Sequence, residues 1–364
     1  MAGALGIGRF AYTPLLPDMV TDFGWSFAQA GDVASANFLG YMAGALIAPL
    51  AATSIYVRFW FAMSLMASVA TTYLGAEAEG FTQWMALRFA AGVASAFCLV
   101  IVTTQLMQVI TTERAPELGN IHFAGVGVGI LVCVGALYRV ASISQQWSRL
   151  GALAAVLLAL AWFICARDEM QPAARTDDAS GYRVSAFLWR LICGYGFFGF
   201  AYVVSATFIV AIASDLDSTL DPNATWLVVG VALIPSVYLW QWLANRFGTV
   251  PVLQVAYVVE AIGIVVTVLS SSVVSLLVGS ALLGGTFAAI TALGLSVARQ
   301  HSPHRIAFTV SSMTVAFAFG QLVGPALAGR MADDLGGFLA PSLLAAGLLL
   351  IACVLLFSRA GDQH

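Results

Sequence analysis

Runs of about twenty uncharged, mostly apolar residues recur along this sequence, and they constrain its fold more than any other feature. A helix of that length, at 1.5 Å per residue, matches the hydrocarbon thickness of a bilayer. Only 9% of the 364 residues are charged, against about 25% in a soluble domain. Strands of a membrane barrel alternate apolar and polar residues, whereas the apolar runs here are continuous. The sequence therefore predicts an all-α polytopic membrane protein.

Hydropathy and turn-forming residues divide the chain into twelve predicted transmembrane helices. They cover residues 1–19, 28–52, 56–76, 81–105, 117–138, 146–166, 186–213, 224–245, 249–270, 273–298, 305–330 and 339–358. The longest polar interval, residues 167–183, contains arginines, acidic residues and a proline, which is typical of a solvated linker. We therefore expect two six-helix bundles, at 1–166 and 186–364, joined by a cytoplasmic linker at 167–185.

The two halves resemble each other. The segment "RFAYTPLLP" from Arg9 aligns with "GFAYVVSATF" from Gly199, a displacement of 190 residues. The segment "FAAGVASAF" from Phe89 aligns with "ALLGGTFAA" from Ala281, a displacement of 192. This near-constant offset predicts an internal duplication of six helices, an architecture found in transporters.

The arginines predict an orientation for these helices. With both termini in the cytoplasm, ten arginines fall in inside loops and three in outside loops, which satisfies the positive-inside rule. The inside set is Arg58, Arg114, Arg167, Arg175, Arg183, Arg190, Arg246, Arg299, Arg305 and Arg359, and the outside set is Arg139, Arg149 and Arg330. Arg9 and Arg88 belong to neither set, because both lie well inside predicted spans, several residues from the nearest span end.

Arg9 and Arg88 are therefore the strongest candidates for function. An arginine at the centre of a membrane helix costs about 2.5–3.5 kcal/mol on insertion scales, so it should face the bundle interior or a wet cavity. Its planar guanidinium suits a carboxylate or a phosphate. One hypothesis is that Arg9, Arg88 or both bind an anionic substrate or a coupling carboxylate. The other is that each arginine caps backbone carbonyls at a helix break.

Two further titratable residues are candidates for proton coupling. Glu260 is the only acidic residue deep in a predicted span, and His122 lies near the start of the fifth. A membrane carboxyl group or a histidine can carry a proton during transport. The alternative is structural, with Glu260 hydrogen-bonded to a neighbouring helix and His122 packed or interfacial.

Uncharged polar side chains at membrane depth are candidate substrate contacts. Asn37 and Tyr41 are four residues apart and share a helix face. Any of these side chains could equally bond a neighbouring helix. The candidates selected for substrate binding are Tyr12, Asn37, Tyr41, Tyr202, Gln241 and Thr286. Glycines spaced four apart, as in Gly40 and Gly44 or Gly320 and Gly324, favour close helix packing.

Several classes of function are disfavoured. The net charge of -3 gives no reason to expect a nucleic-acid partner. No nucleophile–base constellation or metal-ligand cluster appears, so we expect neither an enzyme nor a cofactor or metal. The five cysteines fall inside apolar segments without metal-ligand spacing and are expected to be core residues.

Several motifs resemble those of the major facilitator superfamily. The segment "RFAAG", from Arg88 to Gly92, is similar to its fourth-span motif, and "GQLVGPALAG", with Gly320, Gly324 and Pro325, is similar to a glycine–proline motif of antiporters. The segment "LANRFG", with Asn245 and Arg246, resembles the cytoplasmic motif between spans eight and nine. It departs from that motif in Asn245, where an aspartate is usual, and in Gln241, where a glycine is usual.

More narrowly, "GIGRFAYTPLLP", "SANFLGYMAGAL", "GYGFFGFAY" and "LLGGTFAAITAL" resemble the YbfB/YjiJ-type branch of bacterial transporters. The superfamily fold implies that spans 1, 4, 7 and 10 line a central cavity, which places Arg9 and Arg88 there and Glu260 on a supporting helix. The resemblance implies a multi-pass protein of the bacterial inner membrane, and we expect a monomer.

From these residues we expect a secondary active transporter of a small organic anion, working by alternating access, with protons as a candidate coupling ion. A proton-driven exporter of lipophilic or drug-like compounds is the first alternative. A non-transporting membrane sensor on the same fold is the second.

Overall fold

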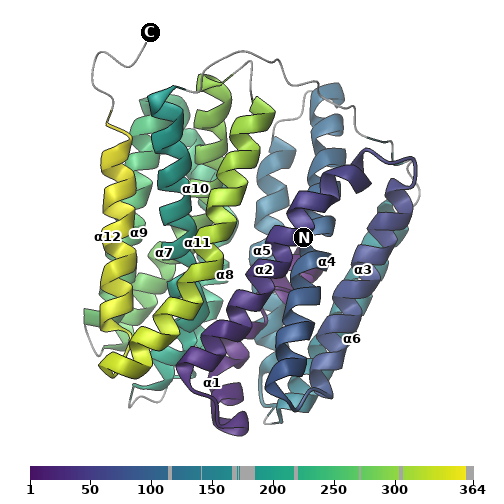
Figure 1. The fold of residues 1–364 in the computed structure, drawn as a ribbon, viewed down its shortest axis with the longest axis vertical. Helices are drawn as coiled ribbons and strands as arrows, with labels where there is room; N and C mark the ends of the chain where they lie inside the picture. Colours follow the sequence, from purple (N-terminus) through teal and green to yellow (C-terminus); the bar gives the residue numbers. More distant parts are fainter. Residues whose placement is uncertain are drawn as a thin grey trace. The chain divides into compact units, whose positions relative to one another are not determined.

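The computed structural model describes residues 1–113, 117–140, 142–165, 170, 172, 185–216, 220–269, 272–302 and 306–357. At 107–113, 117–122, 165, 306 and 307 it describes the backbone alone. These residues form twelve α-helices, a π-helical segment and a short 3-10 segment, with no strand among them (Figure 1). The prediction of an all-α protein with twelve helices is confirmed.

The first half of the chain contains six α-helices and both short segments. Their bounds are η1 Ala2–Ile7, α1 Tyr12–Phe23, α2 Phe27–Ala52, α3 Val57–Tyr73, η2 Leu74–Ala76, α4 Phe81–Glu113, α5 Glu117–Leu137 and α6 Ile143–Cys165. The second half contains α7 Ala186–Ser214, α8 Asn223–Phe247, α9 Thr249–Leu269, α10 Val273–His301, α11 Ile306–Leu335 and α12 Leu339–Leu355.

Nine helices of the described part are long and apolar enough to cross a membrane, and α12 and the described part of α5 are shorter apolar helices. Most predicted bounds agree with the structure within a few residues. The largest extensions are in α4, which runs to Glu113 instead of 105, and in α11, which runs to Leu335 instead of 330. A helix satisfies its backbone hydrogen bonds internally, so it need not end at the membrane surface.

The chain separates into two compact units, Met1–Arg175 and Thr176–His364. The division falls inside the predicted linker at 167–185, most of which lies outside the described residues. The bundle boundaries at 166 and 186 therefore stay a prediction.

The helix predicted over residues 1–19 is interrupted, as one of the two hypotheses for the buried arginines requires. Residues 2–7 form the π-helical segment η1, and α1 begins only at Tyr12. Three glycines among the first eight residues weaken an α-helix here. Pro14 stands in the first turn of α1, where its missing N–H costs no intrahelical bond. Residues 8–11 therefore form a break within the first membrane segment.

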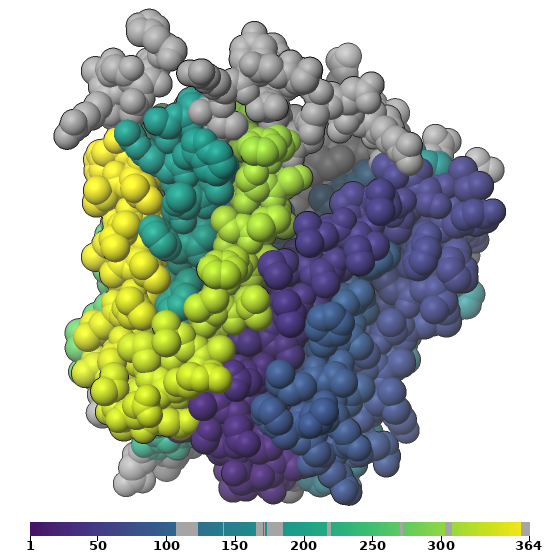
Figure 2. Space-filling view, viewed as in Figure 1, coloured from purple at the N-terminus to yellow at the C-terminus, as the bar shows by residue number. Residues whose placement is uncertain are grey.

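In the N-terminal unit, α2 packs most extensively against α4, and Figure 2 shows the purple side chains of α2 beside the blue ones of α4. Glycines bring these two backbones together. A Cβ atom at Gly40 would lie 1.9 Å from the Phe89 carbonyl oxygen, and one at Gly92 would lie 2.0 Å from that of Asn37. Only a glycine permits so close an approach, so these contacts fix how α4 lies against α2.

The same contacts recur in the C-terminal unit. There a Cβ atom at Gly284 in α10 would lie 2.2 Å from the Val229 carbonyl oxygen in α8. Gly284 and Val229 each lie 192 residues after their counterparts, Gly92 and Asn37. This offset is the one that the sequence alignment predicts, so the internal duplication extends to individual backbone contacts.

The C-terminal unit is built around α7, the most buried of the candidate spans. Helices α11 and α12 pack along it, and Figure 1 shows them on either side of α7. A Cβ atom added at Gly320 in α11 would lie 2.2 Å from the Gly196 carbonyl oxygen in α7. Helix α7 is continuous over the segment that corresponds to the break in the first half. The break is therefore a feature of the N-terminal unit alone within the described residues.

Candidate functional site

The break at residues 8–11 is held by Arg88 from α4. Its Nη1 donates to the Gly8 carbonyl oxygen at 3.1 Å, and its Nη2 donates to the Arg9 carbonyl oxygen at 2.8 Å. The side chain is 4% exposed, and its Cζ lies 5.3 Å from the centroid of the Tyr12 ring. Arg88 thus has the contacts expected of a cap on a broken helix, with Nε as its remaining unpartnered nitrogen.

Arg9 lies in the break itself, and its side chain is 6% exposed. Three aromatic rings surround its Cζ, with centroids at 4.3 Å for Tyr41, 4.8 Å for Phe38 and 5.6 Å for Phe10. Cation–π contacts of this kind contribute up to about 2 kcal/mol when desolvated. They partly offset the cost of burying the guanidinium and fix its plane among the rings.

The Nε and Nη2 groups of Arg9 have no hydrogen-bond partner among the described residues. These two nitrogens form one edge of the guanidinium, on which a carboxylate or phosphate can accept two parallel hydrogen bonds. Buried polar groups in native proteins are almost always hydrogen-bonded. Two unpartnered donors on one edge are therefore typical of a site that receives an anion.

The charge balance around the two arginines points the same way. The electrostatic neighbours of Arg88 are Tyr12 and Arg9, and no carboxylate acts on it within the described part of the chain. Arg88 thus lies near a second buried guanidinium group, and no carboxylate of the described residues balances its charge. An anion that entered this site would lower the free energy of both charges.

Two predicted contact residues are engaged with the backbone around the break. The Tyr12 hydroxyl donates to the Ala30 carbonyl oxygen at 2.9 Å, and the Asn37 Nδ2 donates to the Arg88 carbonyl oxygen at 2.9 Å. The Oδ1 of Asn37 is buried and has no hydrogen-bond partner among the residues that the structure describes. The structure thus brings Arg9, Tyr12, Asn37, Tyr41 and Arg88 into one site of the N-terminal unit.

In the C-terminal unit, Tyr202 of α7 contacts two aromatic rings. It stacks on Phe287 and Phe317 with centroid separations of 5.5 Å each, and its hydroxyl accepts a hydrogen bond from Gln321. The hydroxyl is the part of Tyr202 that remains suited to a polar ligand.

Glu260 of α9 is fully buried, and neither carboxyl oxygen has a hydrogen-bond partner in the described residues. Thr286 of α10 is its neighbour, but the Thr286 hydroxyl donates to the carbonyl oxygens of Leu282 and Leu283 in its own helix. Tyr257, one turn before Glu260, also has a buried hydroxyl without a partner in the described part of the chain. The structure thus brings Glu260 and Thr286 together.

The remaining predicted residues lie elsewhere. Gln241 donates to the Asn245 Oδ1 at 3.2 Å on an exposed turn of α8, and Arg246 lies over the Trp242 and Phe247 rings. Gly324 approaches Val203, and Pro325 stands inside α11. The side chain of His122 lies outside the described residues.

Sequence reasoning missed Phe38 as a member of the arginine site. Phe38 is three residues before Tyr41, so helical spacing places both rings on one face of α2. That spacing was available in the sequence, but Phe38 resembles any lipid-facing aromatic residue. Its contact with Arg9 depends on the break, which the sequence did not reveal.

The fold is similar to those of solved transporter structures. The crystal structure of a mutant of the nucleoside transporter NupG superposes with a TM-score of 0.77 at 16% identity, covering 98% of this chain and 99% of that one. A bacterial homolog of the human lysosomal transporter Spinster gives a TM-score of 0.67 at 16% identity, covering 98% and 92%. At such identities the likeness shows the fold alone.

In sequence, the chain is 30% identical to Protein SGE1 of Saccharomyces cerevisiae over 119 residues. The match spans 31% of this chain and about a fifth, 21%, of that protein. The family model described as "Uncharacterised MFS-type transporter YbfB" matches residues 1–357. That family comprises transporters, not enzymes. The chain therefore belongs to this family and is a multi-pass membrane transporter of the major facilitator superfamily.

Proposed function

We propose that this transporter moves a small organic anion, carboxylate-like in charge and shape, by alternating access, and that Arg9 is its anchor. The observation that carries the proposal is the unpartnered Nε–Nη2 edge of a buried guanidinium. Membrane arginines are costly and mark substrate or ion pathways when they face the protein interior. The surrounding rings hold the guanidinium in one plane, which favours a planar, bidentate acceptor.

In this proposal Arg88 holds Arg9 in position. Its two hydrogen bonds run to the backbone on both sides of the Arg9 amide nitrogen, so they set where the anchor's side chain begins. The polar groups of Tyr12 and Asn37 line the same break. Tyr202, Gln241 and Thr286 belong to the C-terminal unit, and their role as substrate contacts stays a prediction from the sequence.

Proton coupling is a further part of the proposal, with Glu260 and His122 as the candidates. The burial of Glu260 without a charged partner in the described residues favours it, because a carboxylate costs far more to bury than a protonated carboxyl group. We also propose a monomer in the bacterial inner membrane with both termini in the cytoplasm, as the arginine distribution predicts.

The test is a ligand screen of the purified protein followed by flux measurements. Carboxylates, phosphates, nucleosides, sugars and lipophilic cations are compared by thermal shift, in which a ligand at 100 times its Kd adds about 2.7 kcal/mol. Stabilising compounds then enter uptake assays in proteoliposomes, with and without an imposed proton gradient. We expect an organic anion to stabilise the protein and to be transported.

The variant Arg9→Gln is expected to weaken anion binding by roughly 100-fold, about 2.7 kcal/mol, because it removes the charge and one edge of the fork. Arg9→Lys keeps the charge but not the fork and should bind with intermediate affinity. Arg149→Gln, at an exposed arginine of α6, is the matched control and should bind like wild type.

Unchanged anion affinity in Arg9→Gln would contradict the anchor role. Stabilisation by lipophilic cations or neutral compounds, indifferent to that substitution, would favour the exporter. Binding without flux of any solute in intact proteoliposomes would favour the sensor.

A further inference from the structure

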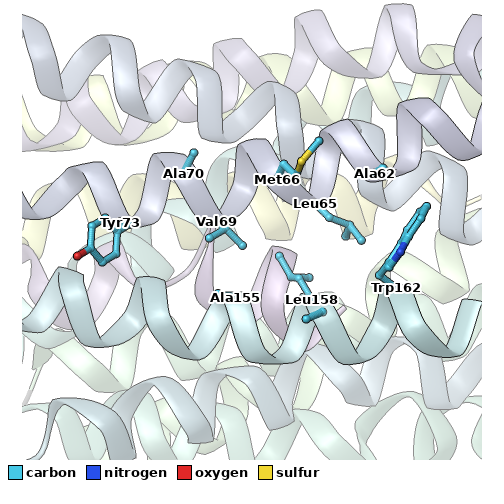
Figure 3. A pocket seen from close by; sticks show the side chains of 10 residues that line it. Ala62, Leu65, Met66, Val69, Ala70, Tyr73, Ala155, Leu158 and Trp162 are labelled. Carbon is cyan, nitrogen blue, oxygen red and sulfur yellow. The ribbon is translucent and has the colours of Figure 1, made fainter. Parts of the chain in front are cut away.

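A second candidate site lies on the surface of the N-terminal unit, between α3 and α6. A groove of about 630 Å³ runs between these two helices (Figure 3). Its side-chain lining is carbon except for the Tyr73 hydroxyl, the Trp162 ring nitrogen and the Met66 sulfur. The lining residues are Ala62, Leu65, Met66, Val69, Ala70, Tyr73, Ala155, Leu158, Ala159 and Trp162. None of them belongs to the arginine site.

The groove has a closed floor and an open rim. Leu65 and Leu158 are buried, and Leu158 rests on η1, where a Cβ atom at Gly3 would lie 2.8 Å from its side chain. Met66 and Tyr73 are exposed at the rim. Only 33% of the apolar window of α3 and 28% of that of α6 are buried. In a membrane transporter such a face lies against hydrocarbon, so an acyl chain can fill the groove from the side.

One end of the groove carries a positive charge. Arg58 is exposed and stands one turn before Ala62, on the groove face of α3, and its Cζ lies 5.4 Å from the centroid of the Trp162 ring. Tryptophan and arginine at the end of a membrane helix are typical of the level of the lipid headgroups. At the other end Tyr73 closes the lining, and Arg149 of α6 is not among the lining residues.

The length of the groove suits a single acyl chain. Ala62 and Tyr73 are eleven residues apart on one helix, which is about 16 Å at 1.5 Å per residue. The hydrocarbon core of a bilayer is about 30 Å thick, so the groove is about as long as one leaflet is deep. A chain whose headgroup lies beside Arg58 would extend along the groove toward Tyr73.

We propose that this groove binds one acyl chain of an anionic glycerophospholipid, with the phosphate beside Arg58 and the Trp162 ring. Guanidinium binds phosphate with several hydrogen bonds, whereas the carbon lining of the groove distinguishes no headgroup. The charge at one end therefore supplies the preference for an anionic lipid. This site stands independently of the substrate that the transporter carries.

The experiment titrates the detergent-purified full chain with phosphatidylglycerol or phosphatidylcholine of identical acyl chains and counts bound lipids by native mass spectrometry. We expect one retained phosphatidylglycerol, bound at least tenfold more tightly than phosphatidylcholine. Ala155→Phe and Ala159→Phe, which fill the groove, should each weaken both lipids about tenfold. Arg58→Gln should bring phosphatidylglycerol to the affinity of phosphatidylcholine and leave the latter unchanged.

Two matched variants control for position and charge. Ala152→Phe adds the same ring to an exposed position of α6 outside the lining, and Arg149→Gln removes an exposed arginine near the other end. Both should bind like wild type. Equal affinity of the two lipids for wild type would overturn the proposal, as would unaltered binding in both Ala155→Phe and Ala159→Phe. Loss of lipid selectivity in Arg149→Gln instead of Arg58→Gln would overturn the placement of the headgroup. If an uncharged lipophile displaced phosphatidylglycerol and phosphatidylcholine equally well, the groove would be a general apolar site and the proposal would fail.

Discussion

At the scale of single residues, the two buried arginines of the N-terminal unit have opposite surroundings. Arg88 donates to two backbone oxygens of a broken helix, whereas the Nε and Nη2 of Arg9 donate to nothing in the described residues. The sequence placed both at membrane depth, because a charge within an apolar run is visible in any window. It could not divide their roles, because the acceptors of Arg88 lie 79 and 80 residues away along the chain.

The substitution Arg88→Gln should destabilise the fold, because it removes two hydrogen bonds from a charged donor, each contributing about 1.5–3 kcal/mol. We expect a loss of about 3 kcal/mol or more in the free energy of unfolding, measured by chemical denaturation in detergent. Arg9→Gln should unfold close to wild type, since neither of its free nitrogens supports the fold. A similar loss of stability in both variants would contradict this division of roles.

At the scale of elements, the spans follow from local composition, and the break does not. The predicted bounds of α2, α8 and α9 agree with the structure within a few residues, because the bilayer requires about twenty apolar residues in each helix. The segment over 1–19 satisfies the same rule and is nevertheless interrupted. Its interruption depends on α4, which supplies Arg88, and on α5, where Gly129 approaches Gly6. Neither contact can be read from a local window.

Two adjacent glycines of α10 allow a matched test of the close contacts between helices. A Cβ atom at Gly284 would lie 2.2 Å from the Val229 carbonyl oxygen, whereas one at Gly285 would meet open space. Gly284→Ala should therefore lower the free energy of unfolding by about 1–3 kcal/mol through overpacking. Gly285→Ala should raise it by about 0.8–1 kcal/mol, since alanine is the better helix former. Equal thermal midpoints for the two variants would show that α8 and α10 adjust freely.

At the scale of the whole molecule, the duplication connects sequence to structure. The offset of 192 residues that aligns two short segments also relates the Gly92–Asn37 approach to the Gly284–Val229 approach. The symmetry fails at one place that matters for function. Arg9 corresponds to Gly199 in α7. Helix α7 is continuous there, and Gly199 approaches the backbone of Phe317 in α11. The charged site is thus built on one half of a repeated scaffold.

The arginine distribution predicts the orientation of this scaffold, and fusions to the chain can test it. A fluorescent protein at the C-terminus should fold and fluoresce in the cytoplasm, and alkaline phosphatase at the same position should be inactive. Phosphatase fused after residue 216, in the predicted outer loop between α7 and α8, should be active, because it needs an oxidising compartment. The reverse pattern of activities would mean that the arginine bias has been assigned to the wrong side.

The sequence by itself determined the membrane class and the number of helices, because both depend on local composition measured against a bilayer of fixed thickness. Its short motifs also resembled the family that the comparisons established. The tertiary structure alone decided that the first segment is broken, that Arg88 holds the break, and that Phe38 and Tyr41 enclose Arg9. These features are contacts between residues far apart in the chain. An apolar pattern predicts that a side chain is buried, but it does not predict which residue that side chain contacts.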